Sequence, residues 1–228
     1  IFLPDNKAGS GSKFFEVEGN GYEPGGGIRL LGNLVDPINH PELTFVGKMS
    51  TFCSNARVLF SEEEKLWRVA GDPTEAAMLV FSQKLGFHKD SLEREDPLLA
   101  ESPFDYRLKY HATVHGSDKN KILSVIGAPE EILNKCSHLY SENKNHPLSL
   151  EVKKQLETIF QKMSEEGLRI IAVATRINFI NILTAESVTD LSFVGFIGMK
   201  DPLRSEVALA MRDAISAGIK VVMITGDH

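Results

Sequence analysis

One residue of this sequence that could do chemistry is an arginine in apolar surroundings. Arg169 stands between Leu168 and the pair Ile170-Ile171. Such a side chain either snorkels to water at a strand edge or reaches an anion, and its planar guanidinium group suits phosphate oxygens. The net charge of −6 argues against wholesale nucleic-acid binding, but it leaves room for one local basic pocket that takes a small anion.

Two other pairs of residues have both a chemical and a purely structural interpretation. Asp72 and Glu75 have the spacing of a helix-capping box, with Pro73 at the first helical position, and that box alone accounts for Glu75. Phe104 and Lys109 are, taken alone, more simply a core residue at the start of a strand and a solvated residue on its polar face. Neither pair predicts a site without further context.

The elements that must position these residues follow from hydrophobic periodicity and from turn residues. Alternating or continuous apolar runs predict strands, apolar residues at helical spacing predict helices, and Gly and Pro mark the turns. The expected strands are 14–17, 103–115, 121–126, 168–174 and 191–198, with a hairpin from 56–60 to 66–69, and the expected helices are 41–56, one opened by Asp72 and ended before Gly86, 129–136 and 150–163.

After Asn178 the pattern changes. The strand at 191–198 is followed by a break at Asp201-Pro202, a helix at 203–217 closed by Gly218, and an almost continuous apolar strand at 219–224. A fully apolar strand after a helix is typical of a parallel sheet that is buried on both faces. We therefore predict two domains, residues 1–198 and 199–228.

The composition is that of an ordinary globular protein, with 228 residues, 42% apolar and 25% charged side chains. The two cysteines, Cys53 and Cys136, cannot build a disulfide scaffold or a four-ligand zinc site, so we expect a reducing compartment and no metal site of that kind. No run of about 18 apolar residues is present, so the chain is not expected to enter a membrane itself. It starts without Met and stops after an apolar run, and we expect it to be part of something longer.

Five motifs follow one another along the sequence. They are Gly71-Asp72-Pro73-Thr74-Glu75-Ala76-Ala77, Ser102-Pro103-Phe104 with Lys109, Gly127-Ala128-Pro129-Glu130, Gly167-Leu168-Arg169 with Ala172 to Arg176, and Gly198 to Arg204 followed by Met223-Ile224-Thr225-Gly226-Asp227. Each motif is weak alone, but five in order are highly specific. Together they resemble the nucleotide-binding domain of P-type ATPases, specifically calcium-pump-like cation transporters, followed by the start of the second half of the phosphorylation domain.

The resemblance implies a nucleotide pocket. It implies that Phe104 stacks on adenine, that Lys109 lines the same pocket, that Glu75 accepts a hydrogen bond from the adenine amino group, and that Arg169 lies against the phosphates. Glu75 would then favour adenine over guanine, because guanine presents a carbonyl at that position. The remaining residues assigned to this pocket are Asp72, Thr74 at the rim, Gly127 and Ala128.

The last motif is assigned to the phosphorylation domain. The resemblance implies that Asp201 and Arg204 belong to the hinge that carries the nucleotide, and that Thr225, Gly226 and Asp227 are incomplete parts of the catalytic site, where Thr225 touches the transferred phosphoryl group. The structural alternatives are a helix cap at Asp201 and an ordinary Thr-Gly-Asp turn.

The sequence departs from the family pattern at one position and lacks one segment. Ile126 replaces the usual Lys before Gly127, so either ATP binding is weakened by about 1.5–3 kcal/mol or Lys109 and Arg169 compensate. The Asp-Lys-Thr-Gly-Thr segment that carries the family's phosphorylated Asp is not in the sequence, and we expect the acidic Mg²⁺ site to lie beyond it as well. A covalent aspartyl-phosphate needs that nucleophile, so the chain alone is not expected to hydrolyse ATP.

The fold class we predict is α/β, or α+β: an antiparallel twisted sheet flanked by helices, followed by a partial parallel segment like that of haloacid dehalogenases. The predicted function is the ATP-binding domain of a cation-transporting ATPase, a cytoplasmic part of an integral membrane protein. Its cofactors would be ATP and Mg²⁺, and its partners the phosphorylation, actuator and transmembrane domains rather than nucleic acid. The transported ion cannot be predicted from this chain.

Two other classes of function stay open. One is a phosphohydrolase of the haloacid-dehalogenase type, which is disfavoured because no Asp-x-Asp motif precedes a strand. The other is a non-catalytic binding module whose pocket has drifted from ATP, for which Ile126 is the only positive evidence. The turn Gly127-Ala128-Pro129 fits either class, since on its own it is simply a strand-to-helix turn.

Overall fold

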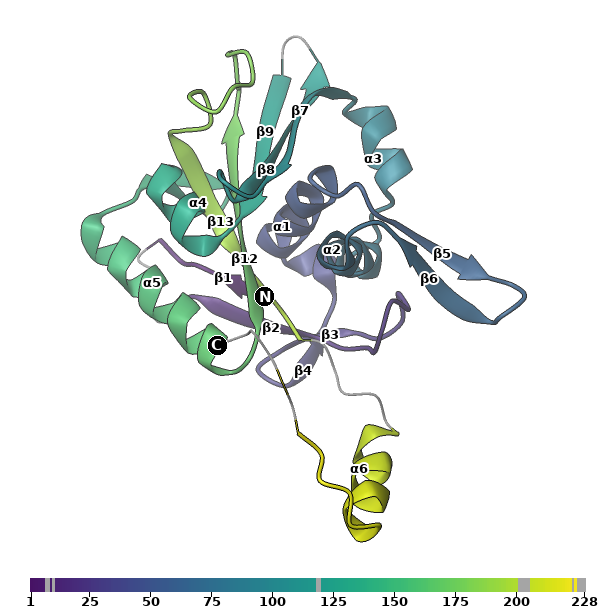
Figure 1. Cartoon of the computed structure of the whole chain (residues 1–228). Coiled ribbons are helices and arrows are strands. Elements are labelled where there is room, and N and C mark those ends of the chain that lie inside the picture. The colour runs from purple at the N-terminus through teal and green to yellow at the C-terminus, as the bar shows by residue number, and fades with distance from the viewer. Residues whose placement is uncertain (7–8, 10, 118–119, 201–205, 223, 225–228) are drawn as a thin grey trace.

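The computed structural model describes residues 1–6, 9, 11–117, 120–200, 206–222 and 224. Its centre is a large, mostly antiparallel sheet of eleven strands (Figure 1). The main path runs in the order β4-β3-β2-β1-β13-β12-β9-β8-β7. These strands are β1 Phe2–Leu3, β2 Lys13–Val17, β3 Ile28–Leu30, β4 Asn33–Val35, β7 Leu98–Asp105, β8 Tyr110–Ser117, β9 Asn120–Gly127, β12 Arg169–Ile177 and β13 Leu191–Met199.

A short branch leaves the middle of this sheet. β10 (Cys136–Ser141) pairs in parallel with β13 and antiparallel with β11 (Lys144–Pro147). All the other strand pairs of the described residues are antiparallel. The prediction of an antiparallel sheet flanked by helices is therefore confirmed.

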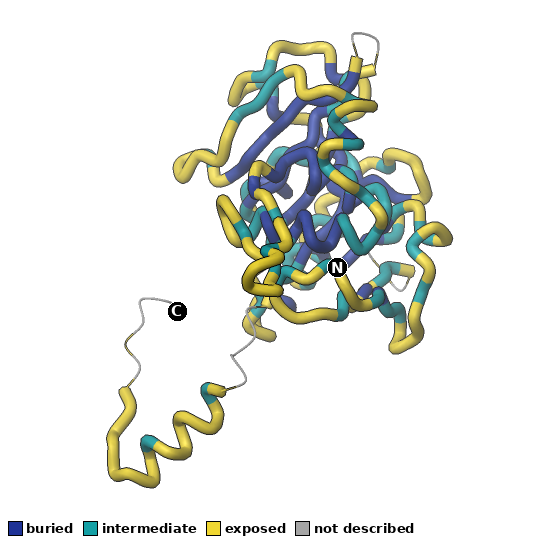
Figure 2. The backbone as a smooth tube through the Cα atoms, turned by 90° about the vertical axis from the view of Figure 1, so that its right-hand side faces the viewer, coloured by how far each residue is buried: buried dark blue, intermediate teal, exposed yellow. Residues whose placement is uncertain are grey.

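Helices cover both faces of the sheet, so its central strands are buried on both sides (Figures 1 and 2). One face packs against α4 (Pro129–Lys135) and α5 (Leu150–Glu165), through residues such as Leu133 and Leu156. The other face packs against α1 (Pro41–Phe52), α2 (Pro73–Lys84) and α3 (Lys89–Glu95), with the 3₁₀ turn η1 (Pro37–Asn39) before α1. Alternate residues of β12 contribute to the two cores, as the pleat requires.

The single strand predicted for residues 103–115 is wrong. The chain reverses within that range, so its first residues end β7 and its last residues lie in β8, and the two strands pair with each other. The Asp105 carboxylate accepts hydrogen bonds from the N–H groups of Arg107 (2.7 Å) and Leu108 (3.1 Å), and Lys109 has a left-handed φ of 55°. The apolar alternation continues across this turn, so periodicity alone could not reveal the reversal.

The predicted hairpin is formed by β5 (Arg57–Ser61) and β6 (Leu66–Ala70), and it projects from the body beside α2 (Figure 1). Its base packs on the helix through a small apolar cluster of Ala56, Ala76 and Leu79. The hairpin and the beginning of α2 therefore form one unit at the edge of the second face.

The C-terminal segment differs from the prediction. α6 (Val207–Ser216) forms within the predicted helix and Gly218 follows it with a φ of +74°, but α6 lies apart from the sheet and buries none of its residues (Figures 1 and 2). The predicted strand at 219–224 is wrong for its described residues, since 219–222 and 224 are irregular and exposed. An apolar strand forms when neighbouring strands cover it, and none of the described strands pairs with this segment.

Candidate functional site

The N-terminus of α2 is capped as the sequence predicts, but Glu75 does not complete a capping box. Asp72 Oδ1 accepts hydrogen bonds from the N–H groups of Thr74 (2.8 Å) and Glu75 (3.1 Å). The Glu75 carboxylate turns away from the cap, and its Oε2 accepts hydrogen bonds from the N–H groups of Asn55 (2.7 Å) and Ala56 (3.1 Å). The purely structural explanation of Glu75 as a box residue is thus incorrect, and its carboxylate faces β8 instead.

Beside Glu75 lies a buried histidine that contacts two carboxylates. The His111 side chain is 2% exposed, with Nε2 2.9 Å from Glu101 Oε1 and Nδ1 3.5 Å from Glu75 Oε1. Burial raises the pKa of Glu75, but hydrogen bonding and positive charge from a protonated His111, together with the two backbone N–H groups, outweigh burial and bring the pKa below its ordinary value. Glu75 is therefore a charged acceptor near neutral pH.

Arg169 links the start of β12 to the start of α2. Its Nη1 donates a hydrogen bond to Thr74 Oγ1 (3.2 Å), and the side chain is exposed at this end of the sheet. Arg176 lies further along β12, where it donates to the Thr189 carbonyl (3.3 Å) and lies 3.8 Å from Asp190. Of the two arginines, Arg169 is the one whose guanidinium group lies near the other predicted residues.

Gly127 and Ala128 end β9 against the turn that contains Lys109. The N–H of Ala128 donates to the Lys109 carbonyl (2.9 Å), and a Cβ on Gly127 would lie 2.8 Å from Tyr110 Cα and still closer to the Lys109 carbonyl. The glycine is therefore required by the chain's own backbone. Lys109 Nζ lies 3.8 Å from Glu130 Oε1, a loose pair with both side chains about half exposed, so the ammonium group stays available to an anion.

Phe104 is not a core residue, as its simplest interpretation required. It is 50% exposed near the end of β7, and its ring contacts Tyr106 edge to face at 5.3 Å between centroids. An exposed aromatic pair offers flat surface to a ring, with stacking worth about 1–3 kcal/mol per base. The sequence analysis missed Tyr106, although a second aromatic residue two positions after Phe104 was a visible signal.

Strand register brings these parts to one end of the sheet. Tyr110 of β8 pairs with Gly127 of β9, and Gly127 in turn pairs with Ala172 of β12. Lys109, Gly127 and Arg169 therefore lie at the same end of the sheet. The start of α2 lies at this end of the sheet as well, because Thr74 contacts Arg169 and Glu75 contacts His111. The remaining predicted residues, Asp201, Arg204, Thr225, Gly226 and Asp227, lie outside the described residues.

Ile126, which stands where the family pattern has Lys, is 5% exposed and packs into the core on the α1 side. Its register partner on β8 is His111. His111 therefore lies next to the position where the family pattern has a Lys, and the sequence analysis did not single it out. His111 and Glu101 are ten positions apart, and only the turn between β7 and β8 brings them together.

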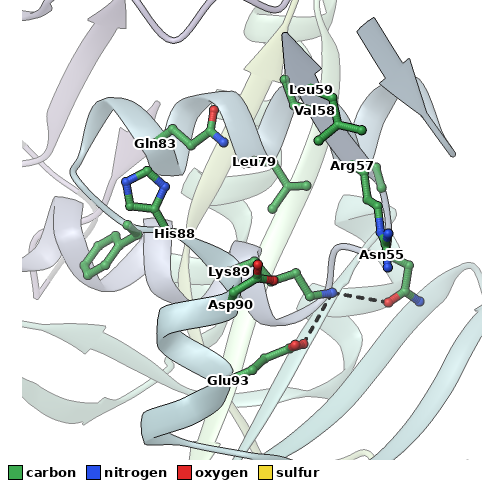
Figure 3. Close-up of a pocket in the computed structure, with 12 residues that line it drawn as sticks. Asn55, Arg57, Val58, Leu59, Leu79, Gln83, His88, Lys89, Asp90 and Glu93 are labelled. Carbon is green, nitrogen blue, oxygen red and sulfur yellow. Dashed lines mark hydrogen bonds and ion pairs between the residues drawn. The ribbon is translucent and has the colours of Figure 1, made fainter. Parts of the chain in front are cut away.

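A separate cavity of about 540 Å³ lies between β5, the second half of α2 and α3 (Figure 3). Asn55 and Ala56 line it and also donate to Glu75, but none of the predicted site residues does. Lys89 crosses it, with Nζ 3.4 Å from both Asn55 Oδ1 and Glu93 Oε1. Because this lysine already has its partners, we place the candidate site at the sheet end, where cations, an acceptor and an exposed ring converge.

Two classes of feature are not found in the described part of the chain. It contains no group of three or more His, Cys, Asp or Glu side chains arranged to hold a metal ion. None of its helices combines the length and the apolar character needed to cross a bilayer.

Comparison with known proteins identifies the family. The family described as P-type ATPase, cytoplasmic domain N, matches residues 43–206, and the chain belongs to this family. The resemblance inferred from the five motifs is confirmed.

Curated relatives match most of the chain. It is 33% identical to a calcium-transporting ATPase of Bacillus subtilis over 226 residues, which are 96% of the chain and 25% of that protein. It is 35% identical to calcium-transporting ATPase 1 of Lactococcus lactis over 181 residues, 76% of the chain and 20% of that protein. It is 32% identical to the cation-transporting ATPase pma1 of Synechocystis over 227 residues, 96% and 24%. The chain thus spans about a quarter or less of these relatives.

Proposed function

We propose that this domain binds an adenine nucleotide at the sheet end where β8, β9, β12 and the start of α2 meet. In this proposal Phe104 stacks on the base, Glu75 accepts from the adenine amino group, and Lys109 and Arg169 neutralise the phosphates. Asp72 and Thr74 hold the rim, and Gly127 and Ala128 shape the backbone beneath the nucleotide. The observation that carries the proposal is the convergence of an exposed ring, a charged acceptor and two cations in a chain of this family.

In a complete P-type ATPase, we propose, the domain presents MgATP for transfer of the γ-phosphoryl group to an aspartate outside this chain. Positioning and charge neutralisation supply most of the catalysis in such a transfer. Asp201 and Arg204 would serve the hinge, and Thr225, Gly226 and Asp227 the phosphorylation site, in a domain that begins near residue 199. Mg²⁺ would enter with the nucleotide, and no residue of this domain is assigned to hold it.

The relatives named above transport calcium or unspecified cations, which supports cation transport as the purpose of the complete protein. We also propose that this domain is the cytoplasmic part of a membrane protein and works with actuator, phosphorylation and transmembrane domains, which the match to a cytoplasmic domain N family supports. The sequence contains no Asp-Lys-Thr-Gly-Thr segment, so the chain by itself should bind ATP without hydrolysing it.

Replacing the stacking ring tests the proposal directly. Phe104→Ala should weaken ATP binding by about 5-fold to 150-fold, since stacking on a base contributes about 1–3 kcal/mol. Isothermal titration calorimetry of the purified chain with ATP, AMP and GTP measures this, and the same samples, assayed for released phosphate, should show none.

Arg176→Ala is the matched control. Arg176 is a cation of the same strand as Arg169 but donates to the Thr189 carbonyl, so its loss should leave ATP affinity almost unchanged. Equal losses of ATP affinity in Phe104→Ala and Arg176→Ala would overturn the pocket assignment. No binding of any nucleotide at millimolar concentration would favour the drifted binding module instead.

A further inference from the structure

The hydrogen bonds around His111 define which ring nitrogen carries the proton. Glu101 Oε1 lies 2.9 Å from Nε2 and also accepts from the Asn55 side-chain amide. An ionised carboxylate only accepts hydrogen bonds, so Nε2 must be the donor. In the neutral ring the other nitrogen, Nδ1, then has no proton and is itself an acceptor.

The bare Nδ1 faces the one oxygen of Glu75 that the backbone leaves free. The N–H groups of Asn55 and Ala56 both go to Oε2, whereas Oε1 lies 3.5 Å from Nδ1. That distance is too long for a good hydrogen bond, and Nδ1 makes no hydrogen bond with any described residue although it is buried. Two acceptors face each other there, and protonation of the ring would convert this contact into an ion pair.

We infer that His111 sets the purine preference of the nucleotide site by competing, when protonated at Nδ1, for Glu75 Oε1. This inference rests on the proposed function. With a neutral ring, Oε1 is free to accept a hydrogen bond from the adenine amino group and disfavours the guanine carbonyl. With a protonated ring, Oε1 is occupied and its charge is neutralised, so adenine loses its advantage. His111 and Glu101 act here as positioning residues.

Two buried titratable side chains near His111 are held neutral by their burial. Cys53, at the end of α1, stays a neutral thiol because burial raises its pKa to about 12. His115, on the same face of β8, stays neutral because burial lowers its pKa to about 4. Lys89 of α3 donates to the Ser54 carbonyl and pairs with Glu93.

The groups that contact the imidazole directly are Glu75 from α2 and Glu101 from β7, and β9 presents the uncharged Ile126 opposite it. Protonation of the ring changes the contact between Nδ1 and Glu75 Oε1 from two facing acceptors to an ion pair. A change of pH that alters the charge of this ring therefore acts on the site through Glu75.

The test compares ATP and GTP dissociation constants at pH 5.5 and pH 8 for the whole chain, by calorimetry. Taking the ratio of the two nucleotides cancels the effect of His111 charge on the phosphates. The preference for ATP should fall about tenfold from pH 8 to pH 5.5, the size of one hydrogen bond to a charged group. His111→Gln should make the ratio independent of pH, and His88→Gln, which changes an exposed histidine of the neighbouring cavity, should retain the pH dependence.

A ratio that does not change with pH in the wild-type chain, or that still changes in His111→Gln, overturns the inference while leaving nucleotide binding intact. A second measurement needs neither a variant nor a ligand. In ¹⁵N NMR spectra of histidine-labelled chain at pH 8, His111 should carry its proton on Nε2, and a proton on Nδ1 would overturn the inference. Failure of the proposed function is distinct, because it would abolish binding of both nucleotides at both pH values.

Discussion

His115 of β8 is a buried histidine whose ring makes no hydrogen bond with any described residue. His115 is 0% exposed, both of its ring nitrogens lack a hydrogen-bond partner, and the ring stacks on Phe52 at 4.0 Å between centroids. Burial, helped by the positive charge of Lys89, lowers its pKa from 6.5 to about 4, although Asp96 and Glu101 oppose the shift. The folded protein therefore keeps this ring neutral.

This buried ring should make the protein less stable in mild acid. Between pH 6.5 and about 4 the unfolded state binds the proton and the folded state does not, so the free energy of unfolding falls as pH is lowered. The pKa difference of about 2.5 corresponds to about 3 kcal/mol, which is lost progressively below pH 6.5 and not above it. Urea unfolding at pH 7.5 and 4.5 measures this loss.

His115→Leu should remove this part of the pH dependence and lose less stability on acidification than the wild-type protein. His88→Leu is the matched control, because the His88 side chain is exposed and its loss should leave the acid sensitivity unchanged. If His115→Leu and the wild-type protein lose stability equally between the two pH values, the buried neutral ring is not the cause.

Single residues with a family position could be predicted from the sequence, but their partners could not. Phe104, Lys109 and Arg169 were identified through motifs, and the structure leaves all three exposed at one sheet end. His111 and Glu101 were missed because their contact depends on the turn at 105–109, across which the apolar alternation continues without a break. Side-chain partners across a hairpin depend on register, and register depends on where the chain turns.

At the scale of elements, caps and breakers were reliable signals. Asp72, Pro73 and Gly86 predicted both ends of α2, since each has a local conformational role that hardly depends on the rest of the fold. The direction in which Glu75 turns was not predictable in this way. The carboxylate accepts from the N–H groups of Asn55 and Ala56, which lie just before the hairpin and reach α2 through the packing of Ala56 on the helix.

The junction of β8, β9 and α4 should not tolerate a side chain at position 127. An alanine Cβ there would meet the backbone at Tyr110 Cα at 2.8 Å and the Lys109 carbonyl still closer, and backbone atoms cannot rotate away as a flexible side chain can. Gly127→Ala should therefore reduce the free energy of unfolding by about 1–3 kcal/mol or more, as overpacking does. Urea unfolding at neutral pH measures it.

Gly25→Ala is a suitable control for that substitution. Its φ is not in the left-handed region, and the nearest atom to an added Cβ is the end of the flexible Glu23 side chain at 3.4 Å. Its effect should stay within about 0.5 kcal/mol, as for ordinary surface changes. Equal effects at the two positions would mean that the backbone at the end of β9 moves apart without cost.

For the whole molecule, burial separates the part of the chain that folds around a core from the part that does not. The two large apolar clusters on either face of the sheet draw their members from the described residues between 1 and 199. The described residues from 206 onward contribute none, although Leu209, Ile215 and Val222 are apolar. The run at 219–224 predicted a strand because its residues are almost all apolar. An apolar segment forms a buried strand only where other strands cover it.

Removing residues 201–228 should therefore leave the stability of the sheet domain unchanged, within about 0.5 kcal/mol. The reason is that no described residue beyond Lys200 is buried, so the truncation exposes no core side chain. Urea unfolding followed by tryptophan fluorescence of Trp67 and by circular dichroism gives the free energy of unfolding and its denaturant dependence, which reports the surface exposed. A second truncation, removing residues 191–228, is the contrasting case because it deletes β13, which pairs with β1, β10 and β12. Removal of residues 191–228 should abolish cooperative unfolding. If removal of residues 201–228 alone lowered the free energy of unfolding by several kcal/mol, the domain boundary would lie beyond residue 198.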